Sequence, residues 1–382
     1  WLSLLAEQLD PQEMDLLLIH PPANPLDVAN FIATPQTSAI SCDRRLLNAR
    51  RNLDQQIRAD QPHQDLGLAL PLVWRQPTTD LAANINAEAI ESLERWLQAP
   101  QKEWLNYQGI NAGEWCDPVN DLSPLSLQER DCHRLLSQRL SEQLDRLANA
   151  PEARWERQEK EDWIARSSGQ GLMPPGAAAE LDADRLERRW QNLQTTVLSL
   201  GPLRLQQQTG STAAGLVMAG ETAVQISTSR LRPSSLLQSW LKHLLAQLND
   251  SGCSTAVVCR QDGSAKADQF HIAMRWSALP AQEADHLIRG LQSLAQQGAQ
   301  VCWPVPPASG LARALAWSKG VEAADKAFVN RWQGGFSGWA ERDQSEQKVC
   351  FGSDCDAELL LCHEGFEPAF QALYQPLLEA RC

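Results

Sequence analysis

The stretch TGSTAAGLVMAGETAVQISTSRLRP, residues 209–233, constrains the possible fold more than any other part of this chain. It reads as a strand, a tight turn and a second strand that runs toward a helix. Further strands are expected at 254–260, 270–276 and 301–307, the last one short and buried, with helical stretches between them. Because strands that alternate with helices imply a central sheet covered by helices, the sequence predicts an α/β fold.

Helical periodicity dominates the chain up to about residue 195. One helical pattern is interrupted at Pro100, since proline cannot continue a helix. The expected helices cover residues 41–59, 87–109, 126–148, 233–250, 281–298, 310–334 and 366–382. The expected caps are Ser41 or Asp43, a capping box of Ser126 with Glu129, and Ser234 or Ser235.

The charge balance limits how this chain could bind DNA. It has 34 basic and 47 acidic residues, a net charge of −13. A protein that binds DNA through phosphate contacts is usually basic, so the charge argues against a self-sufficient DNA-binding protein and leaves open an acidic subunit of an assembly. No apolar run is long enough to span a bilayer, so we expect a soluble, internal protein, and the first residue, Trp1, suggests a fragment of something longer.

The ten cysteines are expected to be free thiols of a reducing compartment, because the sequence shows no secretory leader. The densest group contains Cys350, Cys355, Cys362 and His363. Its spacings match no standard zinc or iron–sulfur pattern. We therefore expect no metal ion there.

Motifs of common catalytic sites are absent from the sequence, which has no glycine-rich phosphate loop, no G-x-S-x-G elbow and no H-E-x-x-H. Its 14 tryptophans are many for this length. We expect them to pack in the core rather than stack on bases, because basic clusters do not accompany them. Two groups of arginines are expected on solvated helix faces: Arg44, Arg45, Arg50 and Arg51, and Arg185, Arg188 and Arg189.

Six segments occur in an order that is typical of one family: HPPANPLDVANF, SCDRRLLNARRNL, ESLERWLQAPQKEWLNYQGI, GLMPPGAAAE, SSLLQSWLKHLLAQL and FQALYQPLLEA. In this order they resemble the carboxy-terminal part of the RecC family, the gamma subunits of exodeoxyribonuclease V. The resemblance runs through nearly the whole chain and is more specific than any single motif. It implies a restriction-endonuclease-like, PD-(D/E)xK-type mixed sheet flanked by helices, with a largely helical N-terminal portion, similar to the nuclease domain of the partner RecB.

The resemblance also implies that the nuclease site is lost. An active relative has G-x-x-D on the first strand of the hairpin and D-x-K on the second, to hold a divalent ion and assist the attacking water. Here Ala213 stands for the first aspartate, and Gln225 and Ser227 stand for the second aspartate and the lysine. Ala99 stands where iron–sulfur relatives have a cysteine ligand. We therefore expect no catalytic residue, no cofactor and no metal.

The resemblance implies a structural, non-catalytic role within a helicase–nuclease complex that acts in DNA repair by recombination. We expect a non-catalytic cytoplasmic domain that supports duplex strand separation, guides the strands and contacts the RecB and RecD subunits. Residues 1–80 would link it to a preceding helicase-like region, and residues 81–382 would form the inactive nuclease-like domain. No motif identifies a strand-splitting pin, so no DNA-contacting residue is assigned.

Two other functions stay open from the sequence. An active Mg²⁺-dependent nuclease of the RecB or AddB kind would need acids from elsewhere in the chain, and Asp250, Asp262 and Glu180 are candidates. Single acids at loop-like positions are far more often surface residues. A protein-interaction domain unrelated to RecC would lack the restriction-endonuclease-like sheet.

Overall fold

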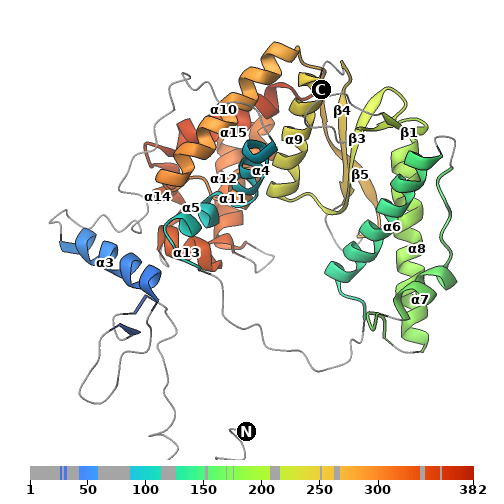
Figure 1. Ribbon diagram of the computed structural model, residues 1–382, viewed down its shortest axis with the longest axis horizontal. Helices are drawn as coiled ribbons and strands as arrows, with labels where there is room; N and C mark the ends of the chain where they lie inside the picture. Colours follow the sequence, from blue (N-terminus) through green and yellow to red (C-terminus); the bar gives the residue numbers. More distant parts are fainter. Residues whose placement is uncertain are drawn as a thin grey trace, which may run out of the picture.

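The architecture is a mixed sheet between two layers of helices, as seen in the computed structural model (Figure 1). The structure describes residues 26–27, 30–31, 43–58, 87–112, 126–150, 154–168, 170–174, 176–206, 216–249, 252–261, 267–335, 340–352 and 355–382. The expected mixed α/β architecture with a helical N-terminal part is confirmed.

Five described strands form the sheet in the order β1-β2-β3-β4-β5. They are β1 (Leu203–Gln206), β2 (Leu216–Ala219), β3 (Thr222–Arg230), β4 (Thr255–Arg260) and β5 (Phe270–Trp276). Neighbouring strands are antiparallel except β3 and β4, which are parallel. Helix α9 (Pro233–Leu248) makes the crossover that a parallel pair requires.

The predicted hairpin is confirmed as β2, β3 and the two residues between them. Gly220 has φ 62°, a conformation that glycine adopts without the steric cost of a side chain. Glu221, the single acid of the stretch 209–233, lies exposed in the turn. The hairpin runs directly into α9, as expected.

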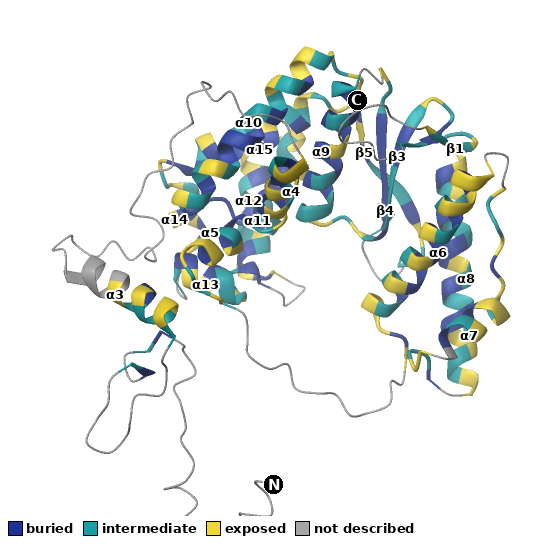
Figure 2. Cartoon of the chain, in the orientation of Figure 1, coloured by how far each residue is buried: buried dark blue, intermediate teal, exposed yellow. Residues whose placement is uncertain are grey.

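The two faces of the sheet contribute to separate hydrophobic clusters. Val257 belongs to one cluster and its neighbour Val258 to the other, because successive strand side chains point to opposite faces. Helices α6 (Glu129–Asn149), α7 (Lys160–Ser168) and α8 (Ala177–Leu198) form one layer. Figure 2 shows that buried residues of the sheet lie between the two helical layers.

The opposite layer contains the larger cluster, to which α9 belongs. Its other helices are α4 (Ala87–Gln98), α5 (Pro100–Tyr107), α10 (Ala281–Gln300), α11 (Pro307–Ala316), α12 (Val321–Gln333), α13 (Ser345–Phe351), α14 (Ala357–Leu361) and α15 (Phe366–Glu379). The break between α4 and α5 falls at Pro100, as predicted. Helix α3 (Arg44–Arg58) lies beside this layer, where the Cβ of Arg45 is 3.5 Å from the position that a Cβ on Gly109 would occupy.

Tryptophans form much of both clusters, as predicted. Trp163 and Trp190 are fully buried on the α8 face, and Trp240 and Trp276 are buried on the α9 face. Rings of Trp240 and Trp276 have their centroids 5.2 Å apart. Large aromatic side chains bury much apolar area, so these residues stabilise the packing of helices on the sheet.

The segment 301–307 is not a strand, which corrects the sequence prediction. Cys302, Trp303 and Val305 are buried as expected, but the backbone carbonyls of Trp303 and Val305 accept hydrogen bonds from the side chain of Gln101. Prolines have no N–H to donate to a strand ladder, and Pro304 interrupts the segment.

Two predicted caps also need correction. Ser126 is exposed and forms no capping box with Glu129, since the Glu129 carboxylate is bound by arginines. Arg232 is the residue before α9, and its N–H donates to the hydroxyl of Ser235, which therefore lies inside the first turn. Asp43 precedes α3 and accepts a hydrogen bond from the Arg45 N–H, as expected of a cap, while Ser41 lies outside the described residues.

The outer edge of β5 is closed by the last described residues. Arg381 forms a β-bridge with Trp276, and the N–H of Cys382 donates to the carbonyl of Arg275. The indole N–H of Trp276 also donates to the carbonyl of Leu377, at 3.1 Å. These contacts satisfy backbone groups that an open sheet edge would expose.

No helix in the described ranges is both long and apolar enough to cross a membrane.

Candidate functional site

The predicted hairpin borders a cavity of about 630 Å³, here called the hairpin cavity. Strands β2 and β3 form one wall, and α4, α6 and α9 contribute the others. Its polar lining includes Glu91, Glu94, His133, Gln225, Ser227 and Lys242. The structure therefore places two of the three predicted site residues in one cavity, while Ala213 lies outside the described residues.

Gln225 and Ser227 form hydrogen bonds within the fold. The Gln225 side chain donates a hydrogen bond from Nε2 to the carbonyl of Ser239, at 2.7 Å. Ser227 Oγ lies 3.1 Å from Ser229 Oγ and accepts a hydrogen bond from the Ser229 N–H. Neither side chain carries a charge, so neither supplies what metal-dependent phosphodiester cleavage requires.

A second polar group attaches β3 to α6. Thr228 Oγ1 lies 2.5 Å from His133 Nδ1 and 2.7 Å from Ser137 Oγ. Burial lowers the pKa of His133, and the nearby Arg232 charge lowers it further. Sequence reasoning missed this group because His133 and Thr228 are 95 residues apart, and only the i,i+4 spacing of His133 and Ser137 could have indicated it.

Glu180, one of the acids proposed as replacement ligands, does not border the hairpin cavity. Glu180 lies on α8, has a side chain that is 60% exposed, and is 3.4 Å from Lys160. Asp250 and Asp262 lie outside the described residues. The acids that do border the hairpin cavity are Glu91 and Glu94 of α4, which the sequence did not single out.

The cysteine group near the end of the chain is dispersed. Cys350 and Cys355 are buried, whereas Cys362 is exposed. Within the described part of the chain, no three His, Cys, Asp or Glu side chains are placed to hold a metal ion.

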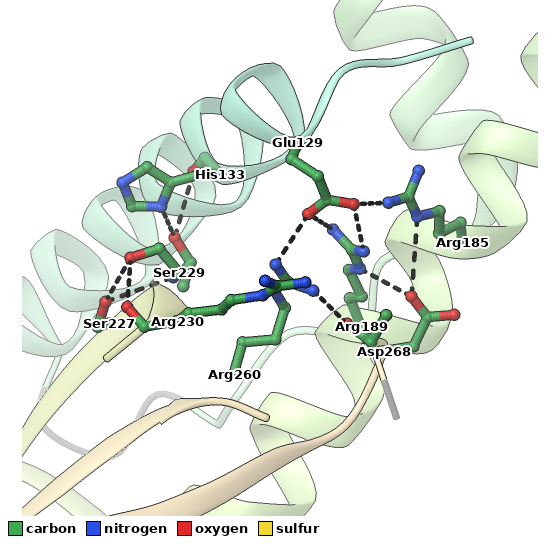
Figure 3. A network of polar contacts seen from close by, with 11 residues as sticks. Glu129, His133, Arg185, Arg189, Ser227, Ser229, Arg230, Arg260 and Asp268 are labelled. Atoms are coloured by element: carbon green, nitrogen blue, oxygen red, sulfur yellow. Dashed lines mark hydrogen bonds and ion pairs between the residues drawn. The ribbon is translucent and has the colours of Figure 1, made fainter. Parts of the chain in front are cut away.

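An ion-pair network, here called the arginine network, joins α6, α8 and β4 (Figure 3). Glu129 pairs with Arg185, with Arg189 at 2.9 Å and with Arg260 at 3.1 Å. Asp268 accepts a hydrogen bond from Arg189 Nε at 2.8 Å. The Arg189 side chain is only 1% exposed, so the prediction of a solvated face is wrong for this residue.

The burial of Arg189 has a clear electrostatic cause. A guanidinium leaves water at a high cost unless its N–H groups meet acceptors of opposite charge. Glu129 accepts from both terminal nitrogens of Arg189, and Asp268 accepts from Nε. Four arginines of the predicted basic groups fit the prediction: Arg44, Arg45 and Arg51 are exposed, and the Arg188 side chain is 58% exposed. The prediction fails in part for Arg50, which is half-buried, and for Arg185, whose side chain is 26% exposed and pairs with Glu129.

The chain matches the model of a known protein family. The model of the RecC C-terminal domain matches residues 86–318, which is more than half of the chain. No curated protein matches this chain. The matched range contains the whole sheet, the hairpin cavity and the arginine network, and on this evidence the chain belongs to the RecC C-terminal domain family.

Proposed function

We propose that this chain is a non-catalytic structural domain of a RecC-type subunit of exodeoxyribonuclease V. The observation that carries the proposal is the hydrogen bond from Gln225 to the Ser239 carbonyl, on a strand that the RecC family match includes. This bond uses the amide to fasten β3 to α9 at the position where an active relative would have an aspartate. Ser227, at the position of the lysine, bonds within its own strand.

The core is proposed to be restriction-endonuclease-like and to comprise residues 81–382. Two observations support this proposal: the hairpin runs into α9 and on to the parallel strand β4, and one hydrophobic cluster joins α4 to α15. Residues 1–80 would connect this core to a preceding helicase-like region.

We propose that the domain supports strand separation, guides the separated strands and contacts RecB and RecD. It would do so during recombinational repair in the cytoplasm. A domain that guides DNA strands must keep its conformation while the strands move past it. The arginine network, in which Arg189 and Arg260 are buried, and the clusters on both faces of the sheet support such a role. The net charge of −13 fits a subunit that contacts DNA as part of an assembly.

A cleavage assay tests the non-catalytic role. The chain is incubated with linear DNA and Mg²⁺, alone and after assembly of its parent subunit with RecB and RecD. We expect no cleavage by the chain alone, and no change in cleavage by the complex when Gln225→Ala or Ser227→Ala is introduced. Cleavage by the chain alone that is abolished by Glu91→Gln or Glu94→Gln would establish a nuclease and contradict the proposal.

A co-purification experiment tests the proposed partners. The parent subunit, with and without residues 1–382, is expressed with RecB and RecD. We expect both partners to be retained by the complete subunit, with loss of at least one when these residues are removed. Equal retention of both partners by the shortened subunit would refute the partner contacts.

A further inference from the structure

Two buried thiols, those of Cys302 and Cys350, lie together in the larger hydrophobic cluster. Cys302 is 2% exposed and Cys350 is fully buried. Their side chains share a hydrogen bond, although they come from distant parts of the chain. The S–H of Cys302 donates to the carbonyl of Trp303, at 3.8 Å, which leaves its sulfur to accept from the Cys350 thiol. The fold therefore brings two oxidisable sulfurs into contact.

Separate contacts hold the two cysteines in place. Gln101 of α5 donates to two backbone carbonyls of the segment 301–305, at 2.8 and 3.0 Å, and so fixes the segment that contains Cys302. Helix α13, which contains Cys350, packs against the same helix α5 (Figure 1). The neighbour of Cys350, Phe351, packs edge-on against Trp332, with ring centroids 5.8 Å apart. Because each backbone is fixed independently, the two thiols meet at a high effective concentration.

A third cysteine of the same cluster shows what distinguishes this pair. A buried cysteine commonly acts as a small apolar side chain, and burial alone does not indicate a chemical role. Cys355 is as buried as Cys302, but its S–H donates to the backbone carbonyl of Asp356, at 3.7 Å. A disulfide requires two cysteines whose side chains already face each other. Cys302 and Cys350 meet that requirement through their shared hydrogen bond.

We propose that Cys302 and Cys350 form an oxidation-sensitive dithiol, which hydrogen peroxide converts to a disulfide within the folded chain. The sulfur of one cysteine attacks the peroxide, the O–O bond breaks, and a sulfenic acid and one water molecule form. The second sulfur then attacks the sulfenic sulfur, the S–O bond breaks as the S–S bond forms, and a second water molecule leaves. The two thiol protons end in the two water molecules. The cysteines lose two electrons and the peroxide gains them.

Burial makes this disulfide slow to form and slow to reduce. It raises the pKa of the Cys302 thiol, and the contact with Cys350 raises it further, whereas the reacting species is the thiolate. Cys362 and Cys382 are exposed and should be oxidised first. Once formed, the buried S–S bond is shielded from reductants, because exchange requires access to a sulfur. The inference is independent of the proposed function, since neither Cys302 nor Cys350 borders the hairpin cavity.

Peroxide treatment of the full chain, followed by peptide mapping, tests the proposal. The folded chain is incubated with hydrogen peroxide, the reaction is stopped with catalase, and the remaining thiols are alkylated in urea. Tryptic peptides of the monomer are then compared by mass spectrometry before and after reduction. We expect a reducible link between peptides 290–313 and 349–381, with Cys302 and Cys350 as the partners. It should form about tenfold or more slowly than Cys362 is oxidised, because the thiolate fraction of a buried cysteine is lower.

Three alanine variants assign the link to its cysteines. Cys302→Ala and Cys350→Ala should each abolish it. The matched control is Cys355→Ala, which removes an equally buried thiol from the same tryptic peptide as Cys350 and should leave the link unchanged. Thermal unfolding checks that each variant folds. If a variant does not fold, fragmentation of the linked wild-type peptides identifies the two cysteines directly.

Four results would overturn the proposal. The first is complete oxidation of the exposed Cys362 and Cys382 with no link between Cys302 and Cys350 at any later time. The second is a link from Cys302 to Cys355, or one that survives Cys350→Ala. The third is a link that forms only after the chain is unfolded in urea, since the proposed disulfide closes in the folded state. The fourth is oxidation of Cys302 as fast as that of Cys362, which would contradict its burial.

Discussion

Gly298 of α10 packs directly against the indole of Trp96 of α4: a Cβ built on this glycine would lie 2.2 Å from Trp96 Nε1. The contact lets α10 and α4 approach closely within the larger cluster. The other glycine of this helix, Gly290, has no atom within 4 Å of the corresponding position. Helix α10 thus contains one glycine, Gly298, that close packing requires, and a second, Gly290, at which a side chain would meet no neighbour.

Gly298→Ala should therefore destabilise the domain by about 1–3 kcal/mol, the usual cost of overpacking a core. Gly290→Ala is the matched control and should stabilise it slightly, by up to about 1 kcal/mol, because alanine has the higher helix propensity. Urea unfolding followed by tryptophan fluorescence measures both changes. Equal effects of the two substitutions would show that the Trp96 contact is not tightly packed.

Loss of Arg189 should destabilise the domain more than loss of its neighbour Arg188. We expect Arg189→Gln to lower the free energy of unfolding by about 2–4 kcal/mol, because Glu129 and Asp268 lose a buried partner. Arg188→Gln, which removes an arginine whose side chain is 58% exposed, should cost less than about 1 kcal/mol. Chemical denaturation of both variants compares the two costs, and a larger loss for Arg188→Gln would contradict the assigned burial.

Acidification should destabilise the fold through His243. Burial between Trp240 and Trp276 lowers the pKa of His243 to about 4, while its Nδ1 shares a 2.8 Å hydrogen bond with Thr255 Oγ1. The unfolded chain binds this proton near pH 6.5 and the folded chain only near pH 4. The stability that depends on neutral His243 is therefore fully present above pH 6.5 and is lost as the pH falls toward 4.

The expected loss attributable to His243 between pH 7 and pH 5 is about 2 kcal/mol. It is measured as the difference in unfolding free energy at the two pH values. His243→Asn, which keeps a polar group near Thr255, should show a smaller pH dependence than the wild type. His286→Asn, at an exposed position on α10, is the control and should keep the wild-type dependence. Identical pH profiles for all three proteins would show that His243 is not buried in its neutral form.

Restoring the nuclease motif should not restore nuclease activity. The triple variant Ala213→Asp, Gln225→Asp and Ser227→Lys is expected to show no strong Mg²⁺-dependent cleavage of linear DNA. The new carboxylate at position 225 would face the Ser239 carbonyl that now accepts from the amide, and the described residues offer no group of side chains placed to hold a metal ion. Efficient cleavage that EDTA abolishes would contradict the proposed loss of the whole site.

The sequence predicts the elements of this fold well where local pattern decides them. The run Thr255–Arg260 is apolar and rich in valine, and it forms the fully buried strand β4. The helix break at Pro100 is likewise a local effect. The segment 301–307 has a similar apolar pattern, but its prolines remove the donors that a strand ladder needs.

Tertiary partners explain the predictions that were wrong. The solvated face assigned to Arg189 and the capping box assigned to Glu129 fail together, since these residues bind each other across 60 positions of sequence. Local spacing holds no information on such a pair. For the same reason local pattern did not predict that Glu91, Glu94 and His133 lie at the hairpin cavity, to which distant helices bring them. Gln225 and Ser227 were proposed from the family resemblance, and their role stays a prediction.

The closure of β5 by Arg381 and Cys382 has a consequence for biosynthesis. Trp276 leaves the ribosome well before its partners, because 101 positions separate it from Leu377. Until α15 and the residues that follow it have been synthesised, the outer edge of β5 exposes unpaired backbone N–H and C=O groups to neighbouring polypeptides. Translation of α15 therefore completes the sheet, and a message truncated before the codon for Leu377 would yield a chain prone to self-association through the outer edge of β5.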